Sequence, residues 1–241
     1  MKHILAIDTS TAWCSVALSL GDTAPLFRHE LVSAGASQRV LPWVEELLNE
    51  ANLTLKDLTA IAVGIGPGAF TGVRLGVAVV QGLAVSCELP ILPVTSLDAI
   101  ASQTIQTAAF KKSQANTFVI ALDARMDEIY WAKYQTSENT PSTIRVGDIQ
   151  LSKPEALDLS NAEYLAGSAL KAYGDRLFTN AGTLLPPASL DPEMNITALG
   201  ILDCAQQLLH EGRQCDVRQL EPMYVRNKVA LTTLERQEAF K

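Results

Sequence analysis

Residues 60–85 read AIAVGIGPGAFTGVRLGVAVVQGLAV, and this stretch decides the fold of the chain. It opens with a short apolar run at 60–63, which is long enough for a buried strand. A turn of glycine and proline follows, and the next ~15 residues have a helical pattern. Glycines at 68, 72 and 76 line one face of that helix, although each costs roughly 0.5–1 kcal/mol relative to alanine. We therefore expect another backbone or a ligand to come close there.

Composition indicates a soluble globular protein. The 241 residues suffice for one large domain or two modest lobes, and 48% hydrophobic with 19% charged residues is an ordinary balance. The net charge of −7 argues against a basic nucleic-acid-binding surface. If the protein acts on nucleic acid, we expect a partner to supply most of the phosphate contacts.

Neither a disulfide framework nor membrane insertion is expected. The four cysteines are widely spaced and form no CxxC pair, which favours reduced thiols. The longest apolar stretch, at 75–85, is interrupted by Gln81 and is too short to span a bilayer. We find no signal peptide and expect a cytoplasmic protein without a membrane partner.

The first half begins as a meander followed by a helix. Strands are expected at 4–7, 13–20 and 26–32, with short antiparallel links. A helix is expected at 37–49, with Ser37 as its N-cap and Trp43 facing solvent or a partner. Its apolar stripe comprises Val40, Leu41, Val44, Leu47 and Leu48.

The second half repeats the first. Ile4-Leu-Ala-Ile-Asp8 matches Val119-Ile-Ala-Leu-Asp123, and the aspartates are 115 residues apart (123 − 8). Each aspartate is followed by a turn and an apolar strand, which predicts an internally duplicated α/β protein. We assign residues 1–105 with 216–241 to an N-terminal, partner-binding lobe and 106–215 to a C-terminal lobe. Further helices are expected at 96–106 and 196–211, and a helical turn from Leu231.

The strand-end residues Asp8, Thr9 and Ser10 have the chemistry of a phosphate or hydrated-cation site. They could equally satisfy the amides of their own turn. Asp123 and Arg125 occupy the corresponding turn of the second half, where a salt-bridged turn is the favoured interpretation. Because both turns lack the glycines that nucleotide contacts need, we expect a degenerate nucleotide site.

Two enzyme classes stay open as alternatives. The sequence from Gly64 to Ala69 fits the dinucleotide fingerprint, with Glu88 at the distance of the ribose acid. Pro67 removes an amide from that turn, so an oxidoreductase is the lesser alternative. A glycoprotease-type metallopeptidase needs a metal, and the three histidines are isolated without any ligand partner at metal-site spacing.

The helix at 75–85 is apolar on almost all of its sides, so we expect it to be buried on two of them. One side should meet a sheet and the other a helix of a partner, with close packing at Gly72 and Gly76. Arg74 in this helix is either a snorkelling side chain or an anchor for a carboxylate. The predicted partner interface comprises Val40, Trp43, Val44, Leu47, Phe70, Gly72, Val73, Arg74, Gly76, Val79, Val80 and Leu83.

Gly64-Ile-Gly-Pro-Gly-Ala-Phe-Thr-Gly-Val-Arg-Leu-Gly76 resembles the GxGPGxFTGxRxG signature of the bacterial TsaB (YeaZ) family. Supporting matches are Ile7-Asp8-Thr9-Ser10, Leu122-Asp-Ala-Arg125 and Pro222-Met-Tyr-Val-Arg226. The resemblance implies an actin-like ATPase fold (ASKHA, RNase H-like) and a role in making threonylcarbamoyladenosine beside the anticodon of tRNA.

The resemblance further implies a non-catalytic subunit without catalytic or metal-binding residues. The catalytic paralogue TsaD carries metal-binding histidines where this chain has Ser96 and Ile100. The implied partners are a TsaD-like catalytic subunit, a TsaE-like ATPase and a second copy of the chain, with tRNA contacted mainly through the complex. No cofactor is required, and weak ATP or ADP binding at Asp8 and Asp123 is compatible with the resemblance.

Overall fold

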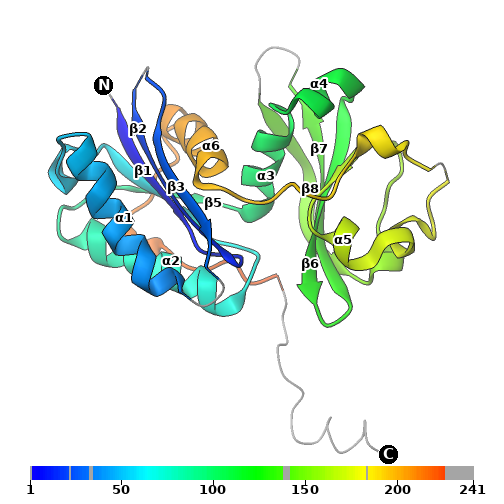
Figure 1. Cartoon of the computed structure of the whole chain (residues 1–241), viewed down its shortest axis with the longest axis horizontal. Coiled ribbons are helices and arrows are strands. Elements are labelled where there is room, and N and C mark those ends of the chain that lie inside the picture. Colours follow the sequence, from blue (N-terminus) through cyan, green and yellow to red (C-terminus); the bar gives the residue numbers. More distant parts are fainter. Residues whose placement is uncertain (1, 22, 33–34, 138–141, 183, 226–241) are drawn as a thin grey trace, which may run out of the picture.

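The computed structural model of the chain describes residues 2–21, 23–32, 35–137, 142–182 and 184–225. Two β-sheets face each other, with helices between them and on their outer faces (Figure 1). Each sheet has five strands and belongs to one half of the sequence, which confirms the predicted α/β fold with two duplicated lobes. The helical turn predicted from Leu231 lies outside the described residues.

The first sheet has the strand order β3-β2-β1-β4-β5. Strands β1 (His3–Asp8), β2 (Trp13–Leu20) and β3 (Leu26–Leu31) form an antiparallel meander, as predicted. Strands β4 (Ala60–Gly64) and β5 (Ile91–Val94) continue the sheet in parallel with β1. Because β1 is central, its apolar run is buried on both faces.

The second sheet repeats this arrangement in the order β10-β9-β6-β7-β8. Strands β6 (Thr117–Arg125), β7 (Glu128–Thr136) and β8 (Thr143–Ser152) form the antiparallel meander. Strands β9 (Tyr164–Ala166) and β10 (Leu190–Asp191) lie parallel to β6. Strand β6 therefore corresponds to β1, and the two sheets share one topology.

Strand β8 is the long element that the sequence pattern did not predict. Only Ile149 of its residues is buried, since the strand lies at the edge of the sheet. Gly147 has a φ of +81°, and the register shifts opposite it between Trp131 and Lys133 of β7. An exposed, irregular edge strand has no apolar alternation from which it could be recognised.

Four longer helices cover the sheets. Helices α1 (Ala36–Glu50) and α2 (Phe70–Val85) lie on the outer face of the first sheet. Helices α3 (Ser96–Thr104) and α6 (Ala198–His210) lie between the sheets, as Figure 1 shows, and confirm the helices predicted at 96–106 and 196–211. Shorter helical segments are α4 (Ala108–Ser113), α5 (Ala169–Tyr173), Leu55–Asp57, Pro154–Ala156, Gly174–Phe178, Pro187–Ser189 and Val217–Gln219.

Helix α6 packs on the first sheet, although the predicted lobe boundaries group its residues with the second half. The amide of Ala198 at its start donates a hydrogen bond to Ser15 Oγ of β2, at 2.8 Å. The lobe boundaries stay a prediction. No helix among the described ranges combines the length and apolarity needed to cross a bilayer.

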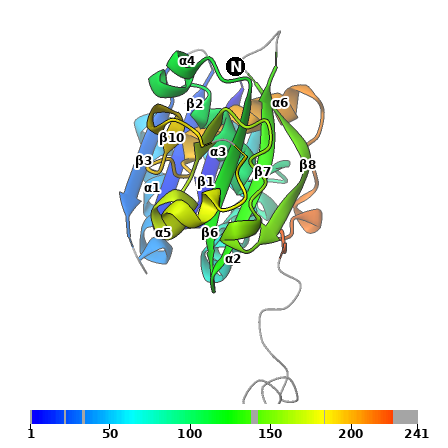
Figure 2. The ribbon, with the colours of Figure 1, turned by 90° about the vertical axis from the view of Figure 1, so that its right-hand side faces the viewer.

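The hydrophobic core has three parts, which follow from the layers. The central part joins the inner faces of both sheets through α3 and α6, and it includes Ile4, Ile120 and Ile201. The other two parts lie under α1 and α2 and under α5, which covers the outer face of the second sheet (Figure 2). Burying one such aliphatic side chain stabilises the fold by about 1.5–3 kcal/mol.

Three expectations for α1 are wrong. Trp43 is only 4% exposed, whereas Leu41 is 48% exposed. The buried stripe runs through Val40, Trp43, Val44, Leu47 and Leu48, which is the i, i+3, i+4, i+7 spacing of one helix face. The helix also begins one residue before Ser37, and Gly35 is the N-cap without a side-chain hydrogen bond.

Gly68, just before α2, and Gly72 and Gly76 within it pack against the turn that follows β1. A Cβ on Gly68 would lie 2.4 Å from the Ser10 carbonyl oxygen, and one on Gly72 would lie 2.0 Å from that of Thr9. A Cβ on Gly76 would lie 3.0 Å from Thr9 Oγ1. The predicted close approach of a backbone is confirmed. The prediction that Gly72 and Gly76 pack against another helix is wrong, because Thr9 already occupies that face.

We predict that Gly72→Ala destabilises the protein by roughly 1–3 kcal/mol, since the added methyl group overlaps the Thr9 carbonyl. Thermal unfolding followed by circular dichroism measures this effect. Gly82→Ala is the matched control on the same helix, because nothing lies within 4 Å of its Cβ position. Alanine at this exposed site should stabilise the helix by about 0.5–1 kcal/mol. Equal melting temperatures for the two variants would contradict the packing described.

Candidate functional site

The turn after β1 directs its polar groups inward. Asp8 is 1% exposed, and its Oδ2 accepts hydrogen bonds from the amide and hydroxyl of Ser10, both at 3.2 Å. The Ser10 hydroxyl also lies 3.3 Å from Ser96 Oγ at the start of α3. Thr9 Oγ1 donates to the Gly72 carbonyl at 2.7 Å. The turn thus ties together β1, α2 and α3.

Asp8 has an unusual electrostatic environment for a strand-end carboxylate. Its Oδ1 is buried without a hydrogen-bond partner. A Cβ atom at position 64 would lie 2.1 Å from this oxygen, so only glycine fits there. Burial raises the pKa of Asp8 from 3.8 to about 6, against the opposing effect of the Ser10 hydrogen bonds. Gly64 therefore makes the room that this carboxyl group occupies.

A cleft of about 410 Å³ separates the Ser10 turn from the corresponding turn of the second lobe. Ser10, Asp123 and Arg125 of the predicted nucleotide set line it, together with Trp13, Tyr130 and Lys171. The structure does not place Asp8 and Thr9 in the lining, because both are buried beneath the turn. The nucleotide site stays a prediction.

Asp123 is engaged by its own lobe. Its Oδ1 accepts hydrogen bonds from the Tyr173 hydroxyl and the Arg125 amide, both at 2.8 Å. Its Oδ2 lies 3.3 Å from Arg125 Nη1. Asp127 in the same turn pairs with Arg176 at 2.7 Å and with Lys153 at 3.3 Å. The interpretation of this segment as a salt-bridged turn is confirmed.

The predicted partner interface divides into covered and accessible residues. Seven of its members are buried in the chain's own core: Val40, Trp43, Val44, Leu47, Val73, Gly76 and Val80. Five are partly or fully exposed: Phe70, Gly72, Arg74, Val79 and Leu83. The predicted set does not include Ala78, Gly82 and Val85, which are also exposed on α2. The apolar pattern of the helix is recognisable in the sequence, whereas the packing of Gly72 and Gly76 against Thr9 is not, because Thr9 is far away in the sequence.

Arg74 is held by aromatic groups. Its Cζ lies 3.1 Å from the centre of the Phe70 ring, and its Nη2 donates to the Tyr224 hydroxyl at 2.7 Å. Phe70 is 53% and Tyr224 55% exposed, so the cluster is open to a partner. It joins α2 to the C-terminal segment, which also donates from the Met223 amide to the Ile65 carbonyl at 2.8 Å.

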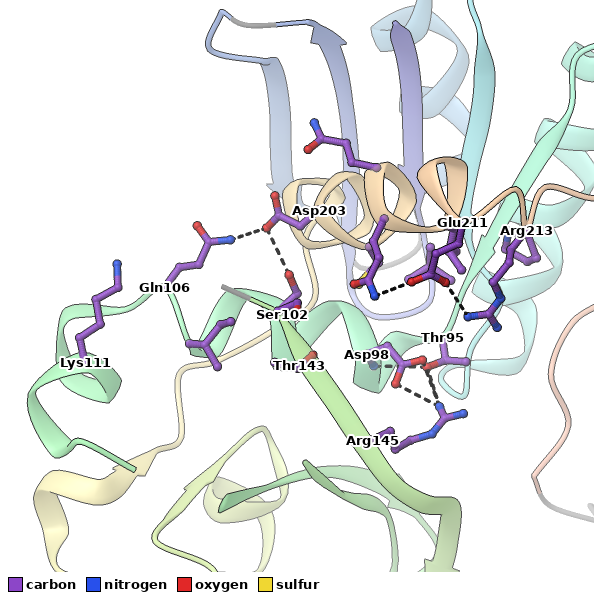
Figure 3. Close-up of a pocket in the computed structure, with 18 residues that line it drawn as sticks. Thr95, Asp98, Ser102, Gln106, Lys111, Thr143, Arg145, Asp203, Glu211 and Arg213 are labelled. Carbon is purple, nitrogen blue, oxygen red and sulfur yellow. Dashed lines mark hydrogen bonds and ion pairs between the residues drawn. The ribbon is translucent and has the colours of Figure 1, made fainter. Parts of the chain in front are cut away.

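A second cavity of about 600 Å³ lies between α3, α6 and β8 (Figure 3). Asp98 of α3 and Arg145 of β8 form an ion pair of 3.0 Å in its wall. The Tyr134 hydroxyl donates to the same aspartate at 2.8 Å. Sequence reasoning did not find this cavity, because its residues come from separate elements and form no motif.

The described part of the chain contains no candidate metal site. There, no group of three or more His, Cys, Asp or Glu residues is arranged to hold a metal ion. His29 is stacked between aromatic rings, at 4.5 Å from Trp13 and 5.7 Å from Phe27, and burial lowers its pKa.

We predict that Asp8→Asn stabilises the protein at about pH 8 by roughly 2–3 kcal/mol. The pKa of Asp8 is higher in the folded than in the unfolded protein, so the protonated carboxyl group stabilises the fold fully below about pH 4. This stabilisation is lost as the pH rises through about 6, where Asp8 ionises in the folded protein. Urea unfolding of the two proteins should differ at the higher pH and converge toward pH 4.

Asp148→Asn, at an exposed carboxylate on β8, controls for the change in net charge. A constant difference between Asp8→Asn and the wild type across this pH range would contradict the assignment of a buried, proton-binding carboxyl group.

Comparison with known proteins supports one family. The family model of TsaD, tRNA N6-adenosine threonylcarbamoyltransferase, matches residues 29–230. The chain is 36% identical to the tRNA threonylcarbamoyladenosine biosynthesis protein TsaB of Escherichia coli, over 98% of this chain and 100% of that protein. Identity to the TsaB of Haemophilus influenzae is 33%, over 98% of both chains.

The solved structures agree. YeaZ from Pseudomonas aeruginosa is 35% identical, with a TM-score of 0.79, over 93% of this chain and 100% of that one. A second structure from the same organism, described as similar to the peptidase YeaZ, has a TM-score of 0.80. With full-length relatives in both comparisons and a family model over most of its length, the chain belongs to the TsaB (YeaZ) family.

Proposed function

We propose that this protein is a non-catalytic subunit in the threonylcarbamoylation of the tRNA adenosine next to the anticodon. It binds and activates a TsaD-type catalytic subunit, and the ATPase TsaE joins the complex. The names of its full-length relatives support this pathway, since they are tRNA threonylcarbamoyladenosine biosynthesis proteins. The cytoplasm is the proposed location, because tRNA modification takes place on soluble substrates.

The outer face of α2 carries the proposal. Val85 is 65% and Phe70 53% exposed, and Ala78 and Gly82 lie between them on the same accessible side. The helix has no acidic residue, and Arg74 is its one charged side chain. Exposed apolar area with little charge is typical of a protein–protein contact. Leu41 of the neighbouring α1 is also exposed, at 48%.

The internal contacts of the two strand-end carboxylates support a non-catalytic role. Asp8 is buried under the Ser10 turn, and Asp123 is held by Tyr173 and Arg125. We propose that the protein needs no cofactor, and that any binding of ATP or ADP in the cleft between the turns is weak. The net charge of −7 supports tRNA contacts made mainly through the complex. The same α2 face could bind a second copy when the catalytic partner is absent.

We predict that Gly82→Glu strongly weakens binding to the TsaD-type subunit. The new carboxylate would be buried without a partner in the apolar contact, while nothing lies within 4 Å of this site in the free chain. Calorimetric titration of the catalytic subunit should show at least a tenfold to hundredfold loss of affinity, roughly 1.4–2.8 kcal/mol. Formation of threonylcarbamoyladenosine in the reconstituted mixture should fall with it.

Gly182→Glu is the matched control, an identical change at an exposed glycine of the second lobe with no atom within 4 Å. Neither variant should melt at a lower temperature than the wild type, because both sites are exposed and free of neighbouring atoms. Full affinity of Gly82→Glu for the catalytic subunit would overturn the proposed interface.

A further inference from the structure

The cavity between α3, α6 and β8 is polar, and its ionic groups balance in number. Three acids and three bases line it: Asp98, Asp203, Glu211, Lys111, Arg145 and Arg213. Its volume of about 600 Å³ falls within the roughly 300–1,000 Å³ of small-molecule sites. None of the residues that line the cavity belongs to α2.

Two of the three acids are neutralised within the protein. Asp98 pairs with Arg145, with Nη1 at 3.0 Å from each carboxylate oxygen. Glu211 pairs with Arg213 at 3.2 Å and accepts a hydrogen bond from Gln207 Nε2 at 2.8 Å. Figure 3 shows these two ion pairs on the side of the cavity near β8 and the end of α6.

Asp203 is the acid without a countercharge. It is partly buried, and its Oδ2 accepts hydrogen bonds from Gln106 Nε2 at 2.7 Å and Ser102 Oγ at 3.4 Å. Among the described residues, no Lys, Arg or His nitrogen forms an ion pair with it. Burial raises its pKa, which reflects the cost of leaving this carboxylate uncompensated. A cation that enters the cavity would remove that cost.

Lys111 is the base without a countercharge. Its side chain is exposed on α4, and within the described ranges its ammonium group makes neither a hydrogen bond nor an ion pair. In Figure 3 its side chain lies on the same side of the cavity as Gln106 and Asp203. One end of the cavity therefore combines an unpaired carboxylate with an unpaired ammonium group.

We propose that this cavity binds a small zwitterion of the amino-acid or dipeptide class. Its ammonium group pairs with Asp203, and its carboxylate pairs with Lys111. A zwitterion satisfies both unpaired groups and adds no net charge to a lining that is already balanced. A purely anionic or cationic ligand would compensate one of the two groups and leave the other unpaired.

Titration of the full-length, isotope-labelled protein with glycylglycine, followed by NMR chemical shifts, tests the proposal. We expect millimolar affinity, with the shifts concentrated around 98–111 and 203–213. N-acetyl-glycylglycine lacks the ammonium group and glycylglycinamide lacks the carboxylate, so both should bind about tenfold more weakly. Free glycine distinguishes an amino-acid site from a dipeptide site.

Two variants assign the ends of the ligand. Asp203→Asn should weaken glycylglycine binding about tenfold, and Lys111→Met should weaken glycylglycine without affecting glycylglycinamide. Asp148→Asn is the control for charge and should bind like the wild type. The proposal is overturned if the wild type binds none of the probes, if Asp203→Asn binds unchanged, or if Lys111→Met tightens binding. The last result would show that Lys111 itself pairs with Asp203.

Discussion

The backbone of the turn after β1 packs directly against the glycine face of α2. The position of α2 and the burial of Asp8 both depend on this contact. Gly68 and Gly72 leave no space for a side chain between the helix and the carbonyls of Ser10 and Thr9. The contact fixes the position of α2 on the first sheet. It also closes the turn over Asp8, whose carboxyl group occupies the room left by Gly64.

This arrangement decides which side of α2 remains available. Gly72 and Gly76, with Val73, Val77 and Val80, face the sheet and the turn, whereas Gly82 and the exposed apolar residues lie on the opposite side. The same contact keeps Asp8 and Thr9 buried, away from the lining of the cleft between the lobes. The outer face of α2 remains apolar and accessible.

The fold could be predicted because its central strands repeat. The runs ending at Asp8 and Asp123 are buried on both faces, and such strands have an unbroken apolar pattern. Edge strand β8 could not be predicted, since one buried residue gives no periodicity. Trp43 lies on the buried face of α1 in place of the predicted Leu41, and the direction of the glycine face depends on Thr9, which is far away in the sequence. The environment of Asp203 could not be predicted, because it depends on the packing of α6 beside α3.

Gly72 and Gly76 hold α2 against the turn after β1, and we propose that the outer face of the helix contacts a catalytic partner. This contact can be tested by hydrogen–deuterium exchange of the protein, alone and bound to a TsaD-type subunit. A partner on this face predicts slower exchange on binding at 36–50 and 70–86, and unchanged exchange in the second sheet at 128–136 and 143–152. Protection confined to the second sheet, with α1 and α2 unchanged, would contradict it.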